Sequence, residues 1–291
     1  MKTGWYHLIA LTIVIVWGTT FISTKLLLTA GLEPDSIFFY RFLMAYTGIG
    51  LFGRPHTNLF SKSWKDEELF ILVGMTGGSL YFLSENYALQ HTQASNVALL
   101  VSTAPLMTAL LSHFFSSNEK LNRNVVMGSL IALTGVAFVV FNGQYILKLN
   151  PVGDILTLSA AFCWAVYTIL LKRIGHRYTT LFITRKVFFY GLLTILPLYL
   201  FHPLKAHLEL FAQPIVWGNL LFLGIGASLL CYFFWNLSVK KLGAVRTTNY
   251  VFIIPLVALI ASSVILDETI TIVAIIGALL ILAGIVLAER R

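Results

Sequence analysis

The chain has 291 residues, of which 58% are hydrophobic and only 11% are charged, and its mean hydropathy is +0.84. Soluble domains carry about 25% charged residues, so this composition excludes a soluble protein and predicts an integral membrane protein. The formal charge of +8 is not accompanied by a basic face with interleaved aromatic residues, which argues against nucleic-acid binding. The two cysteines, Cys163 and Cys231, lie inside apolar stretches and predict neither a disulfide nor a metal site.

Ten apolar segments follow one another along the chain, each long enough to cross about 30 Å of hydrocarbon. The first is not a cleaved signal peptide, because it is too long and contains Lys25. The connections are too short to bury a core of their own. The sequence therefore predicts an all-α integral membrane fold with ten transmembrane helices. The predicted helices cover residues 7–29, 35–53, 69–90, 94–115, 124–142, 153–172, 180–201, 216–238, 244–265 and 271–288.

The second half of the chain repeats the first at nearly constant offset. The residues that match are polar, aromatic or conformationally special, so they do not align by accident as aliphatic residues do. The matched pairs are Trp17 with Trp164, Lys25 with Lys172, Arg41 with Arg185, Gly74 with Gly224, Asn86 with Asn236, Ala94 with Ala244, Pro105 with Pro255, Glu119 with Glu268, and Gly128 with Gly277. We therefore predict two five-helix repeats, residues 1–149 and 150–291.

Five crossings per repeat is an odd number, so the second repeat enters the membrane inverted relative to the first. The charges agree with this topology if both termini are cytoplasmic, because the outer connections then hold only Lys148 and Lys205. The inner connections hold Lys2, Arg54, Lys62, Lys65, Lys120, Arg123, Lys172, Arg173, Arg177, Lys240, Lys241, Arg290 and Arg291. Inverted repeats of this kind are typical of secondary transporters, whose binding site lies near the bilayer midplane.

With these features the chain resembles the paired EamA-type domains of the drug/metabolite transporter superfamily. The resemblance covers nearly the whole chain and rests on Trp17-Gly18-Thr19-Thr20-Phe21 leading to Lys25, Arg41, Tyr87-Ala88-Leu89 before Ala94, Pro105-Leu106, and Glu119 with Gly128 and Gly135. It implies ten helices, cytoplasmic termini and a central cavity lined by the first four helices of each repeat. Members of that superfamily carry amino acids, other metabolites, drugs or nucleotide sugars, often as exporters. The second repeat departs from the pattern at Cys163-Trp164-Ala165, and Glu85 corresponds to Trp235.

Charged residues inside the predicted crossings are the first site candidates, because an ionisable group in a membrane is costly unless it faces a cavity or a partner. Arg41 and Arg185 are repeat-matched and either face a cavity or extend to the headgroups. Glu85 is the one carboxylate well inside a predicted crossing. It either pairs with Lys25 or Arg41, or takes part in proton or substrate handling, so it is also our candidate for proton coupling.

Aromatic and small polar residues complete the predicted cavity wall. Each of them either lines the pathway or serves as packing or a headgroup anchor. The candidates are Trp17, Thr20, Tyr81, Asn96, Trp164, Tyr167, Trp235 and Asn249. Pro105 and Pro255 each remove a backbone donor inside a helix, which gives either a functional bend or a simple packing kink.

Two further sets of residues have a structural interpretation. Gly128 to Ala132, and Gly277 with Gly284, predict close helix contact, either within the chain or between two chains. Glu119 and Glu268 each precede the last helix of a repeat, where a carboxylate stabilises the helix N-terminus.

No motif for hydrolysis inside the membrane is present, neither His-Glu-x-x-His nor Gly-x-Ser-x-Gly, so the sequence does not predict an enzyme. We expect a secondary transporter in the cell membrane that exports an amino acid or a related carboxylate-bearing solute by alternating access. The alternatives are a carrier that exports hydrophobic drugs, or a membrane protein without transport activity. The expected partners are a small-molecule substrate, the lipid bilayer and a coupling proton if Glu85 titrates. No cofactor or metal is expected, and the sequence does not indicate an oligomeric state.

Overall fold

The computed structural model describes residues 3–52, 60–92, 94–115, 122–141, 150–204, 209–266 and 270–290, and these residues contain helices and no strands. Glu119 and Glu268 lie outside the described residues. The first half of the chain forms α1 (Thr3–Thr29), α2 (Pro34–Phe52), α3 (Trp64–Gly74), η1 (Met75–Ser79), α4 (Leu80–His91), α5 (Ala94–Val101), α6 (Ala104–Phe115) and α7 (Arg123–Phe141). The second half forms α8 (Pro151–Gly175), α9 (Thr180–Ile195), η2 (Leu196–Leu200), η3 (Leu210–Ala212), α10 (Pro214–Leu221), η4 (Phe222–Leu230), α11 (Cys231–Leu242), α12 (Ala244–Asn249), η5 (Tyr250–Ile253), α13 (Ile254–Leu266) and α14 (Ile272–Glu289).

Several of these elements join end to end, so that the described residues trace ten helical segments, in agreement with the predicted fold class. Eight segments are long and apolar enough to cross a membrane. The other two are α2 and the continuous α3–η1–α4 segment, which contain Arg41 and Glu85 respectively. Both of these segments place a charged side chain inside the bundle, since Arg41 is 2% exposed and Glu85 is 4% exposed.

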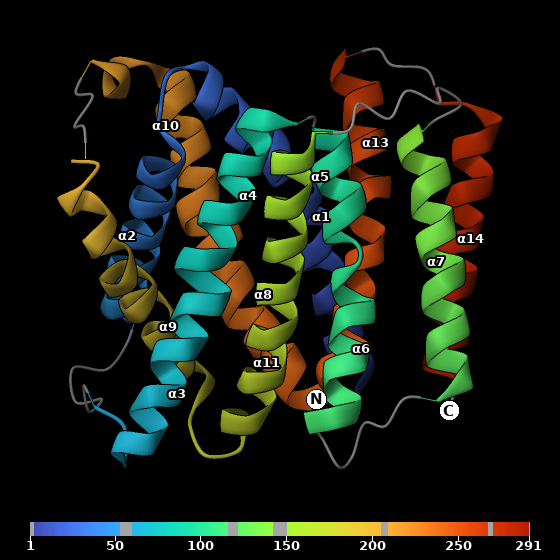
Figure 1. The fold of residues 1–291 in the computed structure, drawn as a ribbon, viewed down its shortest axis with the longest axis horizontal. Coiled ribbons are helices and arrows are strands. Elements are labelled where there is room, and N and C mark those ends of the chain that lie inside the picture. The colour runs from blue at the N-terminus through green and yellow to red at the C-terminus, as the bar shows by residue number, and fades with distance from the viewer. Residues whose placement is uncertain are drawn as a thin grey trace.

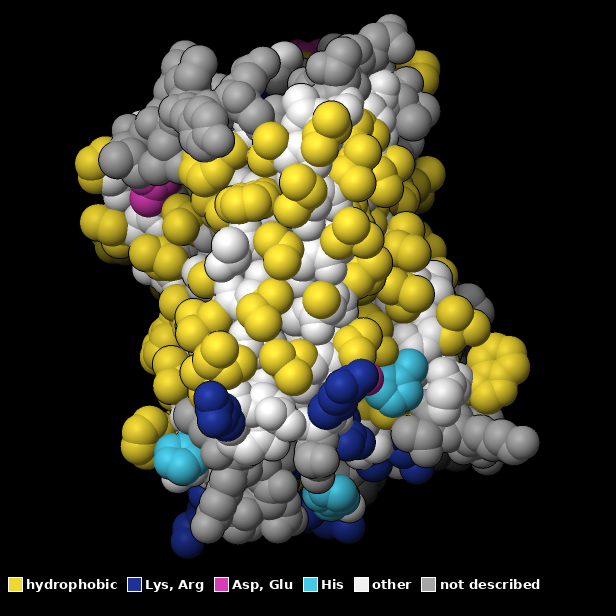
Figure 2. All heavy atoms as spheres, turned by 90° about the vertical axis from the view of Figure 1, so that its right-hand side faces the viewer, with side chains coloured by type: hydrophobic (Ala, Val, Ile, Leu, Met, Phe, Trp, Pro, Cys, Tyr) yellow, Lys and Arg dark blue, Asp and Glu magenta, His cyan; other side chains and the backbone are white. Residues whose placement is uncertain are grey.

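The segments run side by side along one direction, and both chain ends lie at the same end of the bundle (Figure 1). Helix α1 runs away from this end, whereas its repeat counterpart α8 runs towards it, which is the inverted relation that an odd number of crossings requires. Figure 2 shows hydrophobic side chains over the middle of the α7–α14 side of the molecule, with Lys and Arg side chains gathered at the end that holds the termini. This distribution fits a protein that spans a bilayer.

Helices α7 and α14 form a close pair at one side of the bundle (Figure 1). A Cβ atom on Gly128 would lie 2.5 Å from the Gly284 carbonyl oxygen, and one on Gly135 would lie 2.5 Å from the Gly277 carbonyl oxygen. The backbones therefore touch at these four positions, and no larger side chain fits between them. The predicted glycine contacts thus serve packing within the chain, between the last helices of the two repeats.

Polar residues at the helix starts define where several segments begin. The side chains of Ser63, Asn150, Thr179 and Thr271 each accept a hydrogen bond from the backbone N–H three residues further on. Such caps satisfy donors that have no partner inside the helix, and Pro151 adds a preset backbone angle at the start of α8.

The α-helix is interrupted immediately before each of the two predicted bend prolines. The turn at residues 102–103 separates α5 from α6, whose second residue is Pro105. The 3₁₀ stretch η5 separates α12 from α13, whose second residue is Pro255. The fourth segment of each repeat therefore changes its winding near its middle, next to the cavity described below.

Candidate functional site

A cavity opens near the middle of the bundle, where α1, α2, α4, α5, α8, α11, η5 and α13 meet. These elements all belong to the first four segments of each repeat, as the family resemblance implies. The cavity contains about 450 Å³ of space not filled by atoms, counting the part that is open to the outside. It is lined by Trp17, Thr20, Phe21, Arg41, Tyr81, Phe82, Glu85, Val101, Trp164, Tyr232, Val251 and Ile254.

Aromatic rings form much of the cavity wall, and further buried rings pack behind them. The ring centroid of Trp17 lies 5.1 Å from that of Trp164 and 4.8 Å from that of Trp235, and the centroid of Tyr81 lies 5.1 Å from that of Trp164. These separations are those of favourable edge and offset ring contacts. Trp235 is fully buried. The rings therefore give the cavity a rigid, largely apolar wall.

Arg41 places a positive charge in this wall. Its side chain is 2% exposed, its Nε donates to the Ser228 hydroxyl at 3.0 Å, and its guanidinium lies 4.1 Å from the centroid of the Phe82 ring. Within the described part of the chain, the other guanidinium nitrogens have no hydrogen-bond partner. Because Arg41 lines the cavity, these nitrogens are available to an anionic group of a solute.

Glu85 places a negative charge in the same cavity. Its side chain is 4% exposed, and its Oε2 is buried without a hydrogen-bond partner. Arg41 and Glu85 interact electrostatically, yet the ion pairs found among the described residues do not include one between them. The cavity thus presents two separate charges of opposite sign.

Six of the predicted site residues line the cavity, namely Trp17, Thr20, Arg41, Tyr81, Glu85 and Trp164. Two more, Tyr167 and Trp235, are buried and pack against the Trp164 ring at centroid distances of 5.1 and 5.8 Å. Tyr167 is also part of a chain of polar side chains, because its hydroxyl donates to Asn236 Oδ1 and the Asn236 side-chain amide donates to the Thr184 hydroxyl.

The other three predicted site residues lie away from the cavity wall. Asn249 is fully buried, and neither atom of its amide group has a hydrogen-bond partner. Asn96 is buried and donates to Thr92 at 3.2 Å. Arg185 stands over the Phe182 ring at 5.7 Å. The repeat match between Arg185 and Arg41 therefore does not extend to the cavity.

Sequence reasoning missed half of the lining, including Phe82, Tyr232, Val101 and Val251. The repeat contains the signal that could have found them. The offset of 150 relates Phe82 to Tyr232 and Val101 to Val251, so the cavity wall is built from matched positions of both repeats.

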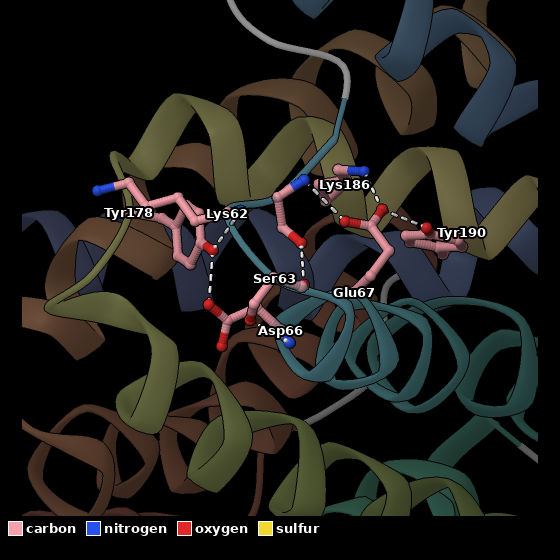
Figure 3. Close-up of polar contacts among 8 residues, drawn as sticks. Lys62, Ser63, Asp66, Glu67, Tyr178, Lys186 and Tyr190 are labelled. Carbon is pink, nitrogen blue, oxygen red and sulfur yellow. Dashed lines mark hydrogen bonds and ion pairs between the residues drawn. The ribbon is translucent and has the colours of Figure 1, made fainter.

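Lys25 does not pair with Glu85, because its ammonium group donates to the Leu89 carbonyl at 2.8 Å. Lys186, a second cation inside a predicted crossing, bonds instead to Glu67 at the start of α3. Both side chains of this pair are buried, at 3% and 4% exposure. Figure 3 shows Glu67 held between Lys186 and Tyr190, whose hydroxyl also donates to the carboxylate.

The neighbouring Asp66 accepts a hydrogen bond from the Tyr178 hydroxyl (Figure 3). It accepts another from Arg177. Asp66 precedes the apolar part of its segment, and the Tyr178 hydroxyl together with the charge of Arg177 holds the pKa of its carboxyl below the ordinary value. We call Asp66, Glu67, Arg177, Tyr178, Lys186 and Tyr190 the terminal-end network. It joins α3 to α9 and to the α8–α9 connection at the end of the bundle that holds both chain termini.

Many membrane transporters are helical bundles built from two inverted repeats with a binding site between them. The fold and the charged, aromatic cavity of this protein are typical of that class. The model of the EamA-like transporter family matches residues 4–141 and 151–289. The chain therefore belongs to the EamA-like transporter family, and it is a transporter and not an enzyme.

Curated relatives and a solved structure agree with this assignment. The chain is similar to an uncharacterized transporter of Archaeoglobus fulgidus, with 25% identity over all of this chain and 99% of the relative. It is also similar to a probable amino-acid metabolite efflux pump of Salmonella typhimurium, with 29% identity over 95% of this chain and 92% of the relative. A solved crystal structure aligns with a TM-score of 0.76 and 19% identity over 99% of this chain and 97% of that chain, which shows a shared fold.

Proposed function

We propose that this transporter exports a small metabolite that carries both a carboxylate and an amino group, by alternating access around the central cavity. The observation that carries the proposal is the separation of Arg41 and Glu85, two buried and opposite charges that face one cavity without pairing. Removing two charges from water is costly, and a structural pair would recover that cost by direct contact. Unpaired charges are instead suited to a ligand that supplies both counter-charges.

Each part of a zwitterion has a matching group in the cavity. The free guanidinium nitrogens of Arg41 suit a carboxylate, because hydrogen bonds between ions of opposite charge are among the strongest. The unpartnered Oε2 of Glu85 suits an ammonium group, and the faces of Tyr81 and Trp164 add cation–π attraction. The remaining apolar wall accommodates a hydrophobic side chain. An amino acid satisfies all three requirements.

The name of the Salmonella relative, a probable amino-acid metabolite efflux pump, supports both the substrate class and the direction of transport. The topology in which both termini are cytoplasmic rests on the Lys and Arg side chains at the end of the bundle that holds the termini (Figure 2). With this orientation, the terminal-end network lies at the cytoplasmic side of the cavity. We propose that it holds α3 and α9 together while that side is closed.

The aromatic wall also favours a second candidate function, the export of hydrophobic drugs. Apolar rings such as Trp17, Trp164 and Tyr232 would bind a neutral aromatic solute without help from either charge. In this case the two buried charges would serve protein stability or proton movement, and their removal would leave the affinity for the solute largely unchanged.

The deciding experiment measures uptake of a mixed pool of isotope-labelled amino acids, other carboxylates and hydrophobic drugs into proteoliposomes, read by mass spectrometry. We expect accumulation of one or more amino acids. Arg41→Gln removes hydrogen bonds to a charged group, worth about 1.5–3 kcal/mol, and should therefore raise the half-saturation concentration by roughly 10-fold or more.

Arg185→Gln is the matched control, because Arg185 is the repeat counterpart of Arg41 and lies outside the cavity. It should leave the half-saturation concentration unchanged. Uptake of drugs alone, with equal affinity in the wild type and Arg41→Gln, would replace the amino-acid proposal by the second candidate.

A further inference from the structure

Two π-helical segments, η1 and η4, occupy corresponding places in the two repeats. In η1 the chain closes a wide turn through the Leu80 N–H, which donates to the Met75 carbonyl five residues back. In η4 the Cys231 N–H likewise donates to the Gly226 carbonyl, five residues back. The π-helix is rare and often marks functional sites. Its recurrence at the repeat offset shows that it belongs to the design of the fold and is not a local irregularity.

Each π-helical segment offers a carbonyl group to a side chain of the cavity wall. The Tyr232 hydroxyl donates to the Gly77 carbonyl in η1 at 2.7 Å. The Trp17 indole N–H donates to the Ala227 carbonyl in η4 at 3.0 Å. The offset of 150 relates Gly77 to Ala227, so the same backbone position is bound in both repeats. These two bonds connect the cavity wall directly to the two widened turns.

A third bond from the cavity wall ends on η4, in this case on a side-chain hydroxyl. Ser228, next to Ala227, accepts the bond from Arg41 described above. Arg41, Trp17 and Tyr232 all line the cavity, and the Trp17 and Tyr232 rings lie 6.0 Å apart. A solute in the cavity would therefore contact three side chains that are hydrogen bonded to residues of η1 or η4.

The two segments also lie at the surfaces where the repeats meet. Segment η1, from the first repeat, packs on α8 and α9 of the second, and η4 packs on α1 and α2 of the first. The contact is close, since a Cβ atom on Gly77 would lie 2.3 Å from the Tyr167 ring. In an alternating-access cycle these are the surfaces that must move. A widened turn can absorb such motion, because local π adjustments keep backbone groups satisfied inside a membrane.

We propose that η1 and η4 are the paired hinges of the transport cycle, and that Tyr232 and Trp17 are positioning residues that couple them to the occupant of the cavity. Tyr232 joins the hinge of one repeat to the helix that directly follows the hinge of the other. Its hydroxyl makes the two hinges move together. This proposal rests on the alternating-access mechanism of the proposed function, and it does not depend on which solute is transported.

Tyr232→Phe tests the proposal, because it removes the hydroxyl and keeps the ring in the cavity wall. The matched control is Tyr199→Phe, which removes a hydroxyl that donates to the Asp35 carbonyl at 3.2 Å, in a 3₁₀ turn outside η1 and η4. The first readout is hydrogen–deuterium exchange of peptides covering η1 and η4 in the full-length protein, without any solute. We expect roughly 5-fold faster exchange in both segments of Tyr232→Phe, and wild-type exchange in the control.

The second readout is the rate of amino-acid uptake into proteoliposomes as a function of concentration. The maximal rate of Tyr232→Phe should fall by a similar factor while the half-saturation concentration stays unchanged, because the lost hydroxyl bonds to the backbone and not to the solute. Unchanged exchange, or an unchanged maximal rate in a protein that transports, would overturn the hinge proposal. Absence of amino-acid uptake by the wild type would instead overturn the proposed substrate, and the exchange measurement would then decide the hinge by itself.

Discussion

The buried ion pair between Lys186 and Glu67 allows the sharpest stability prediction. Replacing Lys186 by Met removes the cation and leaves the Glu67 carboxylate, 4% exposed, without a counter-charge. Breaking a buried pair in this way costs about 3–5 kcal/mol, because the remaining charge is still desolvated. The hydrogen bonds to Glu67 from Tyr190 and from the Ser61 N–H do not neutralise it.

The same network contains a natural comparison. Arg177 pairs with Asp66 but is 46% exposed, so solvent screens this pair and its contribution is about 0–1 kcal/mol. Arg177→Gln should therefore cost far less than Lys186→Met. The double variant Glu67→Gln with Lys186→Met removes both charges of the buried pair. It should regain much of the stability that the single variant loses.

The measurement is the unfolding of purified protein in detergent, followed by circular dichroism under matched conditions. At about 2 °C per kcal/mol for a chain of this size, Lys186→Met should lower the apparent melting temperature by roughly 6–10 °C. The reasoning would be refuted if Lys186→Met melted like Arg177→Gln, or if the double variant were no more stable than Lys186→Met alone.

Two further predictions concern the cavity and the helix pair α7–α14. Glu85→Gln should reduce uptake driven by a pH gradient without loss of folded protein, since Gln carries no titratable proton; full activity from mildly acidic to mildly alkaline pH would remove Glu85 from the mechanism. Gly284→Ala should cost about 1–3 kcal/mol of stability, because its Cβ would lie 2.5 Å from the Gly128 carbonyl oxygen, whereas Gly218→Ala, with nothing within 4 Å, should be neutral in the same thermal assay.

The sequence predicts the fold of this protein well because the fold follows from properties that are local or repeated. The lengths of the apolar segments predict where the helices lie. The odd number of crossings per repeat predicts that the second repeat is inverted, and the repeated glycines predict the contact between α7 and α14. The cavity is only half predicted. Arg41 and Glu85 stand out because charge inside an apolar segment is conspicuous, whereas Val101 and Val251 have no chemical signal apart from their repeat offset.

Other features could not be predicted because they depend on contacts between distant segments. Glu67 lies just before the predicted start of its crossing, where the sequence suggests an exposed loop residue. It is buried with Lys186 because α3 packs on α9. The π-helical winding of η1 cannot be read from Met75–Ser79 alone, because Gly77 and Gly78 weaken an α-helix there without specifying what replaces it. The bond from the Tyr232 hydroxyl to the Gly77 carbonyl comes from a distant segment and could not be predicted either.

The two ends of the bundle are not equivalent, although the two repeats share one helical pattern. The offsets of the repeat relate Glu67 to Trp217 and Lys186 to Phe42, so apolar side chains occupy the matched positions of this ionic contact. A strictly symmetric pair of inverted repeats would give its two open states equal energy. In the proposed cycle, a state that separates α3 from α9 would break the buried ion pair between Lys186 and Glu67, whereas no ion pair occupies the matched positions, Phe42 and Trp217. In the proposed cycle, the terminal-end network therefore favours closure of the cytoplasmic side, and solute binding must offset this bias before the carrier can load from that side.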